Sequence, residues 1–217
     1  QMFSLSGGIE AVPDSGMEEK MPKALLEITG LKKYYPIEAG IAKKQVGLVK
    51  AVDDVTLQIQ KNEVLGVVGE SGCGKSTLGR SIIRLLEATD GSVLLDGKDI
   101  THVKGQELKK AREKMQIVFQ DPYSSLNPRL RIEATIMEPL KHSGRFSSKG
   151  KMKEEANRLM NLVGIDERLR QSFPHELDGG RRQRVGIARA LALQPDFVVC
   201  DEPVSALDVS IQAQIVN

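Results

Sequence analysis

A stretch between residues 69 and 77 combines glycines with one lysine and three hydroxyl side chains, in the order Gly-Glu-Ser-Gly-Cys-Gly-Lys-Ser-Thr. It fits the pattern G-x-x-x-x-G-K-[ST], in which glycines let the backbone wrap closely around phosphate groups. Successive N–H groups and the start of a following helix would stabilise the negative charge. We expect Lys75 to reach the β- and γ-phosphates of a nucleotide and the Ser76 hydroxyl to hold Mg²⁺. The predicted nucleotide-binding residues of this stretch are Gly69, Ser71, Gly72, Cys73, Gly74, Lys75, Ser76 and Thr77.

Two adjacent carboxylates, Asp201 and Glu202, follow the apolar run 197–200. Asp201 at the end of such a strand could approach a Mg²⁺ ion held by Ser76. Glu202 could accept a proton from, or orient, a water that attacks the γ-phosphate. Taken alone, two carboxylates after a strand also fit an ordinary charged turn. The phosphate-binding pattern upstream favours the catalytic interpretation.

The two cysteines occupy unrelated contexts. Cys73 lies inside the glycine-rich stretch, beside the expected start of a helix, a setting that can lower the pKa of a thiol and make it reactive. The alternative is an inert small residue in a tight loop. Cys200 is distant in the sequence, so the pair does not indicate a secreted disulfide framework, and a reducing cytosol is the simpler expectation.

Apolar periodicity predicts the elements that must position these residues. Strands over 25–35 and 48–59, joined by a glycine-containing loop, indicate an antiparallel sheet. The short apolar run 64–68 predicts a strand buried on both faces before the phosphate-binding stretch, with a helix beginning near Lys75. Further strands are expected over 92–95, 115–119 and 197–200, and helices over 151–163 and 181–193.

The composition fits one large α/β domain. The 217 residues include 31 Lys and Arg against 29 Asp and Glu, and the resulting net charge of +2 gives no reason to expect a nucleic acid partner. No stretch approaches the roughly 20 apolar residues that cross a bilayer, so we expect no direct membrane insertion. Residues 1–22 lack periodicity and are expected to be a disordered tail or an expression remnant.

A third motif lies between the two candidate sites. Residues 173–190 read Phe-Pro-His-Glu-Leu-Asp-Gly-Gly-Arg-Arg-Gln-Arg-Val-Gly-Ile-Ala-Arg-Ala and closely resemble the signature region of ABC ATPases. The Ser-Ala-Leu-Asp run at 205–208 resembles their D-loop. Gln120 resembles their Q-loop glutamine, and Tyr35 resembles the aromatic A-loop residue that stacks on adenine. Together these motifs follow the order and spacing of the family over residues 24–217.

The resemblance implies a P-loop NTPase fold. This comprises a RecA-like core, an antiparallel β subdomain formed by the early strands, and an inserted helical subdomain over about 122–186. The implied nucleotide-binding domain spans 23–217. Its implied cofactors are ATP and Mg²⁺.

The resemblance also implies a role for each motif residue. The implied catalytic residues are Glu202, Gln120 and Lys75, and the implied metal ligands are Ser76, Gln120 and Asp201. Tyr35 would contact the adenine of bound ATP. Asp178, Gly179 and Gly180 would contact the γ-phosphate of ATP held by a second subunit, so hydrolysis would require two chains.

The segment 120–129, which reads Gln-Asp-Pro-Tyr-Ser-Ser-Leu-Asn-Pro-Arg, is similar to that of dipeptide and oligopeptide permease ATP-binding subunits. The implied function is an ATP-hydrolysing subunit that powers a peptide importer. The implied partners are transmembrane permease subunits and a second ABC ATPase subunit, in a homodimer or a heterodimer of homologues. The chain would be cytoplasmic and peripheral on the inner face of the cell membrane, held there by the permease.

The signature departs from the family's usual L-S-G-G-Q, because Asp178 stands at the serine position and Arg181 at the glutamine position. An ionised carboxylate cannot donate a hydrogen bond to a γ-phosphate and would repel it, while Arg181 could partly offset this. On this interpretation the signature is the weaker half of an asymmetric pair. The alternative is that Asp178 caps the following helix as a serine would.

The sequence ends at Asn217, before the place of the family's switch histidine. We therefore expect a domain truncated at its C-terminus, with weak or absent ATPase activity alone. One alternative function is a soluble ABC ATPase of DNA repair or translation, and the absence of a long coiled coil before the signature disfavours a repair protein. Another is an ATP-sensing subunit with little hydrolysis, which Glu202 disfavours.

Overall fold

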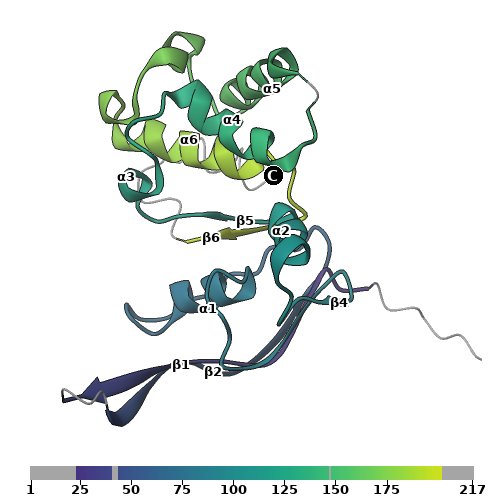
Figure 1. Cartoon of the computed structure of the whole chain (residues 1–217), viewed down its shortest axis with the longest axis vertical. Helices are drawn as coiled ribbons and strands as arrows, with labels where there is room; N and C mark the ends of the chain where they lie inside the picture. The colour runs from purple at the N-terminus through teal and green to yellow at the C-terminus, as the bar shows by residue number, and fades with distance from the viewer. Residues whose placement is uncertain (1–22, 41–43, 147, 202–217) are drawn as a thin grey trace, which may run out of the picture.

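The computed structural model describes residues 23–40, 44–146 and 148–201. Two sheets form its framework (Figure 1). The larger sheet is antiparallel in the order β2-β1-β3-β4, and the smaller is a parallel pair, β5 and β6. The strands are β1 (Leu26–Ala39), β2 (Lys44–Ile59), β3 (Asp90–Leu95), β4 (Lys98–Asp99), β5 (Met115–Val118) and β6 (Phe197–Cys200). The antiparallel pairing of β1 with β2 confirms the predicted early sheet.

Helices make up most of the rest of the described chain. The α-helices are α1 (Lys75–Ile82), α2 (Gly105–Lys114), α3 (Pro122–Ser125), α4 (Ile132–Ser143), α5 (Lys149–Leu162) and α6 (Gly179–Leu191), with 3-10 turns η1 (Glu167–Gln171) and η2 (Pro174–Glu176). Both long helices predicted from apolar spacing are present and begin two residues before their predicted starts. The earlier starts follow from capping, because Ser148 and Asp178 each accept a backbone N–H from the first turn.

The β5–β6 pair separates two hydrophobic cores. Alternate residues of a strand point to opposite faces. Accordingly Val118 and Val198 pack into the core of α4, α5 and α6, whereas Met115 and Val199 pack into the core of α1 and the antiparallel sheet. Figure 1 shows the corresponding arrangement, with the helices α4 to α6 on one side of β5 and β6 and α1 with the larger sheet on the other.

The prediction of a buried strand over 64–68 is wrong. The structure assigns no strand there, and Val64 and Val68 are 78% and 97% exposed. A strand buried on both faces needs neighbouring strands that pair with its backbone. In the residues that the structure describes, β5 and β6 pair only with each other and offer this run no partner. An apolar run shows the tendency to be buried, but the pairing depends on other parts of the chain.

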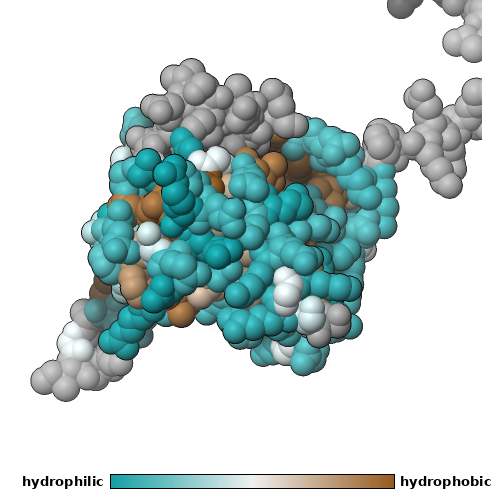
Figure 2. Space-filling model, turned by 90° about the horizontal axis from the view of Figure 1, so that it is seen from above, coloured by the Kyte–Doolittle hydropathy of each residue, from teal (hydrophilic) through white to brown (hydrophobic). Residues whose placement is uncertain are grey.

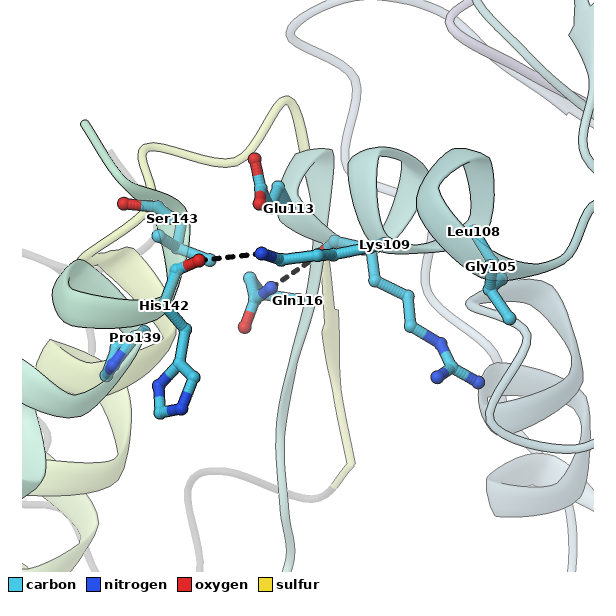
Figure 3. A pocket seen from close by; sticks show the side chains of 10 residues that line it. Gly105, Leu108, Lys109, Glu113, Gln116, Pro139, His142 and Ser143 are labelled. Carbon is cyan, nitrogen blue, oxygen red and sulfur yellow. Dashed lines mark hydrogen bonds between the residues drawn. The ribbon is translucent and has the colours of Figure 1, made fainter.

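A cavity of about 270 Å³ lies where α2 meets the end of α4 (Figure 3). The Lys109 side chain crosses it from α2, and its Nζ donates to the His142 carbonyl of α4 at 2.7 Å. Because Ala111 of α2 belongs to the core of the antiparallel sheet and Leu140 of α4 to the helical core, this hydrogen bond joins the two halves of the molecule.

The face seen from above the helices in Figure 2 is mostly hydrophilic, with separate hydrophobic areas. Several large apolar side chains of α4 and α5 instead point inward, among them Ile136, Leu140 and Leu159, which are 0 or 1% exposed. In the described ranges, no helix has the length and apolar character needed to cross a membrane.

Candidate functional site

The glycine-rich stretch forms a loop that ends in α1. Its last glycine, Gly74, precedes the helix with a φ of 102°, a left-handed conformation that favours glycine. A Cβ atom at this position would lie 2.0 Å from the carbonyl oxygen of Ala51 in β2. Only glycine therefore allows the loop to run this close to β2, which sets where α1 begins.

Lys75 points back into the loop. Its Nζ donates to the carbonyl oxygens of Gly69 and Glu70, both at 2.7 Å, and lies 3.8 Å from the exposed Cys73 Sγ. The loop thus places an ammonium among the backbone groups predicted to surround phosphate. The reactivity of Cys73 stays a prediction.

Ser76 and Asp201 meet, although they are 125 residues apart in the sequence. The Ser76 hydroxyl donates to Asp201 Oδ1 at 2.8 Å, and Asp201 is only 8% exposed. Two contacts produce this approach. The Asp201 N–H donates to the Val118 carbonyl at 3.0 Å, which extends the β5–β6 ladder, and Gly79 brings α1 so close to β6 that a Cβ there would be 2.8 Å from Val199 Cγ1.

Arg80 is a residue of this cluster that the sequence analysis missed. Its Nη2 lies 3.5 Å from Asp201 Oδ2, opposite the oxygen that Ser76 contacts. The spacing carried a signal, because residues four apart on a helix share a face. A cation one turn after Ser76 was therefore a candidate neighbour of Asp201.

Tyr35 lies on β1 at the register of Val49 in β2 and is 37% exposed. Lys33 Nζ lies 4.9 Å from its ring centroid. The neighbouring Tyr34 turns to the other side of the strand, where its hydroxyl donates to Asp53 and lowers the pKa of that carboxyl. Tyr35 thus keeps an accessible aromatic surface on the antiparallel sheet.

Gln120 follows β5 and is exposed. Side chains of α6 hold the segment on either side of it. Gln183 Nε2 donates to the Phe119 carbonyl at 3.5 Å, and the Arg182 guanidinium lies 3.8 Å from the Tyr123 ring centroid. Arg189 completes the contact by donating to the Ser125 carbonyl at 2.6 Å, and burial lowers the pKa of its guanidinium. The position of the Gln120 segment is therefore coupled to the signature helix.

Asp178 is the N-cap of α6. Its Oδ1 accepts the Arg181 N–H at 2.7 Å, and its Oδ2 lies 3.4 Å from Arg181 Nε. Gly179 and Gly180 form the first turn, and Gly179 is exposed. Among the described residues, no hydrogen bond or ion pair links this turn to the loop 69–77. The structure thus brings together the loop and Asp201 but not the signature.

Comparison with known proteins decides the family. The family model described as ABC transporter matches residues 52–205. The chain belongs to this family. It is 47% identical over 196 residues to the oligopeptide transport ATP-binding protein AppF of Bacillus subtilis (strain 168) and 50% identical over 200 residues to the oligopeptide transport ATP-binding protein OppF of Escherichia coli (strain K12). These matches cover 90% of this chain, and the chain spans 59% of the length of each relative.

Solved structures show the same family fold. The ATP-binding cassette MJ0796, in a dimeric post-hydrolysis state bound to ADP and Pi, superposes with a TM-score of 0.78 at 31% identity. The match covers 88% of this chain and 79% of that one. A second dimeric structure of MJ0796, described as a bacterial ABC transporter cassette, has a TM-score of 0.77 at 30% identity. The predicted P-loop NTPase fold is confirmed.

The donors around Asp201 suit Mg²⁺. This ion prefers hard oxygen ligands and is commonly held by one or two protein oxygens together with substrate phosphates, not by an all-protein cage. The Ser76 hydroxyl and the Asp201 carboxylate provide such oxygens beside the ABC domain's phosphate-binding loop. In the part of the chain that is described, no group of three or more His, Cys, Asp or Glu side chains could form a separate cage.

The capping role of Asp178 leads to a stability prediction. Replacing an N-cap Asp by Ala removes the side-chain acceptor of the Arg181 N–H, so Asp178→Ala is expected to lower the free energy of unfolding by about 1 kcal/mol. Asp178→Ser is the matched control, because serine caps equally well, and it should stay within a few tenths of a kcal/mol of wild type. Urea unfolding followed by circular dichroism measures both. Equal stability of the alanine and serine variants would contradict a capping role.

Several predicted residues lie outside the described residues. They are Glu202, the 205–208 motif and the 1–22 segment. Their assigned roles stay predictions from the sequence.

Proposed function

We propose that this chain is the ATP-binding and ATP-hydrolysing domain of a subunit that powers an ABC transporter for peptide import. The observation that carries the proposal is the 2.8 Å contact between Ser76 of the phosphate-binding loop and the buried Asp201. A glycine-rich loop can bind many anions. A carboxylate that meets the loop's own hydroxyl provides, in addition, the oxygens for a nucleotide-bound Mg²⁺.

Each predicted site residue would have a separate role in ATP binding or hydrolysis. The backbone of Gly69 to Thr77 and the Lys75 ammonium would bind the phosphates, and Tyr35 would stack on the adenine. Ser76 and Asp201 would hold Mg²⁺, with Gln120 as a further ligand, and the ion would neutralise charge on the phosphates. Glu202 would take the proton of the attacking water.

A second ABC ATPase subunit would complete the site. Within the described residues, no hydrogen bond or ion pair links the Asp178 turn to the chain's own phosphate-binding loop. Amides at the start of a helix can bind an anion, so those of α6 could meet the phosphates of a partner's ATP. The dimeric state of the MJ0796 structures supports this arrangement. Asp178 caps α6, and its ionised carboxylate would in addition repel the partner's γ-phosphate, which would make this the weaker signature of an asymmetric pair.

The transport role draws its support from relatives. AppF and OppF are named as oligopeptide transport ATP-binding proteins. We therefore propose transmembrane permease subunits as partners and a position on the cytoplasmic face of the membrane.

Hydrolysis by the full-length protein tests the proposal. Wild type should release phosphate from ATP only with Mg²⁺, and Glu202→Gln should lose at least about 100-fold in rate, because the proton acceptor is removed. Glu176→Gln is the control, since Glu176 caps the 3-10 turn η2 by accepting the Phe173 N–H. ATP binding by wild type without hydrolysis would favour an ATP-sensing subunit instead. Equal rates for wild type and Glu202→Gln would exclude Glu202 as the base.

A further inference from the structure

Both oxygens of the Asp201 carboxylate face groups of α1. The Ser76 hydroxyl donates to Oδ1 at 2.8 Å, and Arg80 Nη2 lies 3.5 Å from Oδ2. Ser76 and Arg80 are one helical turn apart on the same face. One of these groups, the hydroxyl, can become a ligand of a cation. The other is itself a cation.

Arg80 is held beside Asp201 by charge more than by good hydrogen-bond geometry. The 3.5 Å separation is at the long limit for a hydrogen bond, and Arg80 Nε is buried without any hydrogen-bond partner. An unpaired buried donor costs stability. That cost is offset because Asp201, at 8% exposure, would otherwise be a buried carboxylate without a counter-charge.

No other cation is available to balance Asp201 in the described part of the chain. Lys75 is adjacent to Ser76 in the sequence, but it directs its ammonium to the carbonyl oxygens of Gly69 and Glu70. Within the described ranges, Arg80 alone forms an ion pair with Asp201. A guanidinium does not lose its proton in proteins, so this charge is permanent.

We infer that Arg80 is the positive charge that balances Asp201 at the proposed metal site. It balances Asp201 while the site holds no metal ion, and it keeps Mg²⁺ out until the phosphates of a nucleotide bring additional negative charge. This inference rests on the proposed Mg²⁺ site. It adds that the cation enters with the nucleotide and not before it.

The physical reason is the balance of charge around one carboxylate. Without nucleotide, a divalent cation at Ser76 and Asp201 would meet a carboxylate whose charge Arg80 already balances, and the guanidinium would repel it. With ATP bound, the attraction between the cation and the negative β- and γ-phosphates outweighs its repulsion by Arg80. Solvent weakens the effect, because the Arg80 side chain is 43% exposed, but does not remove it.

Titration of the full-length protein with Mn²⁺, followed by electron paramagnetic resonance, tests the inference without any hydrolysis. Arg80→Gln keeps a hydrogen-bond donor for Asp201 and removes the charge, whereas Arg80→Lys keeps the charge and removes the planar guanidinium. In the absence of nucleotide, Arg80→Gln should bind Mn²⁺ about tenfold more tightly than wild type, from the Coulomb repulsion that is lost. Arg80→Lys should resemble wild type. Circular dichroism and nucleotide binding in EDTA check that each variant is folded.

The outcomes separate the inference from the proposed function. Equal Mn²⁺ affinity of nucleotide-free wild type and Arg80→Gln would overturn the role of Arg80, as would an Arg80→Lys variant that binds as tightly as Arg80→Gln. Both results would leave the proposed metal site intact if all three proteins bind Mn²⁺ when a non-hydrolysable ATP analogue is present. Failure of wild type to bind Mn²⁺ with the analogue would overturn the metal site itself, and the inference with it.

Discussion

Nucleotide binding should be lost when Lys75 is replaced by alanine. The Lys75 ammonium is already placed in the loop by the carbonyl oxygens of Gly69 and Glu70, so binding phosphate needs little reorganisation. Each hydrogen bond to a charged group contributes roughly 1.5–3 kcal/mol, and the Lys75 ammonium is predicted to reach two phosphates. We therefore expect Lys75→Ala to weaken the binding of a fluorescent ATP analogue by at least about 100-fold.

Lys110→Ala is the matched control for this measurement. Lys110 is an exposed lysine on α2 and lies outside the phosphate-binding loop. Its removal changes the net charge equally but should leave the affinity within about twofold of wild type, because an exposed charge at a distance is screened by salt. Similar losses in both variants would show that overall charge, not the position of Lys75, controls binding.

Hydrolysis should be lost when Asp201 is replaced by asparagine. The substitution keeps the size of the side chain and an oxygen for the Ser76 hydroxyl, but removes the charge that would hold Mg²⁺. We expect the rate of ATP hydrolysis by the full-length protein to fall by at least about 100-fold, as phosphoryl transfer depends on the metal. Nucleotide binding in EDTA should be unchanged, since no metal contributes there.

Asp196→Asn provides the control for Asp201. Asp196 lies just before β6 and forms an exposed ion pair with Lys114 at 3.5 Å. Surface ion pairs contribute little to stability, so this variant should hydrolyse ATP at close to the wild-type rate. If Asp201→Asn also kept the wild-type rate, Asp201 would have no role in holding Mg²⁺.

Local features could be predicted from the sequence because they depend on contiguous residues. The loop before α1 needs only its glycines and Lys75, which follow one another in the chain. The antiparallel pairing of β1 with β2 follows from alternation within two neighbouring segments. Asp178 was recognised as a possible cap for the same reason, as its partner Arg181 is three residues away.

Prediction failed where an element depends on distant partners. The run 64–68 has the apolar character of a buried strand, yet the structure leaves it exposed and unpaired. Similarly, nothing in the sequence near Gln120 indicates that Arg182 would stack on Tyr123. Contacts of this kind arise from the packing of α6 against α3, which no local pattern reports.

The sequence by itself determined which groups are available for the chemistry: a loop that can bind phosphate, a hydroxyl, a carboxylate and a variant signature. Only the tertiary structure decided which of them meet. Asp201 reaches Ser76 because β6 pairs with β5 and because Gly79 lets α1 pack against Val199. The same packing brings Arg80 to the other oxygen of the carboxylate. Distances between residues far apart in the chain are set by such packing, so the charge balance of the proposed metal site became visible only in the folded molecule.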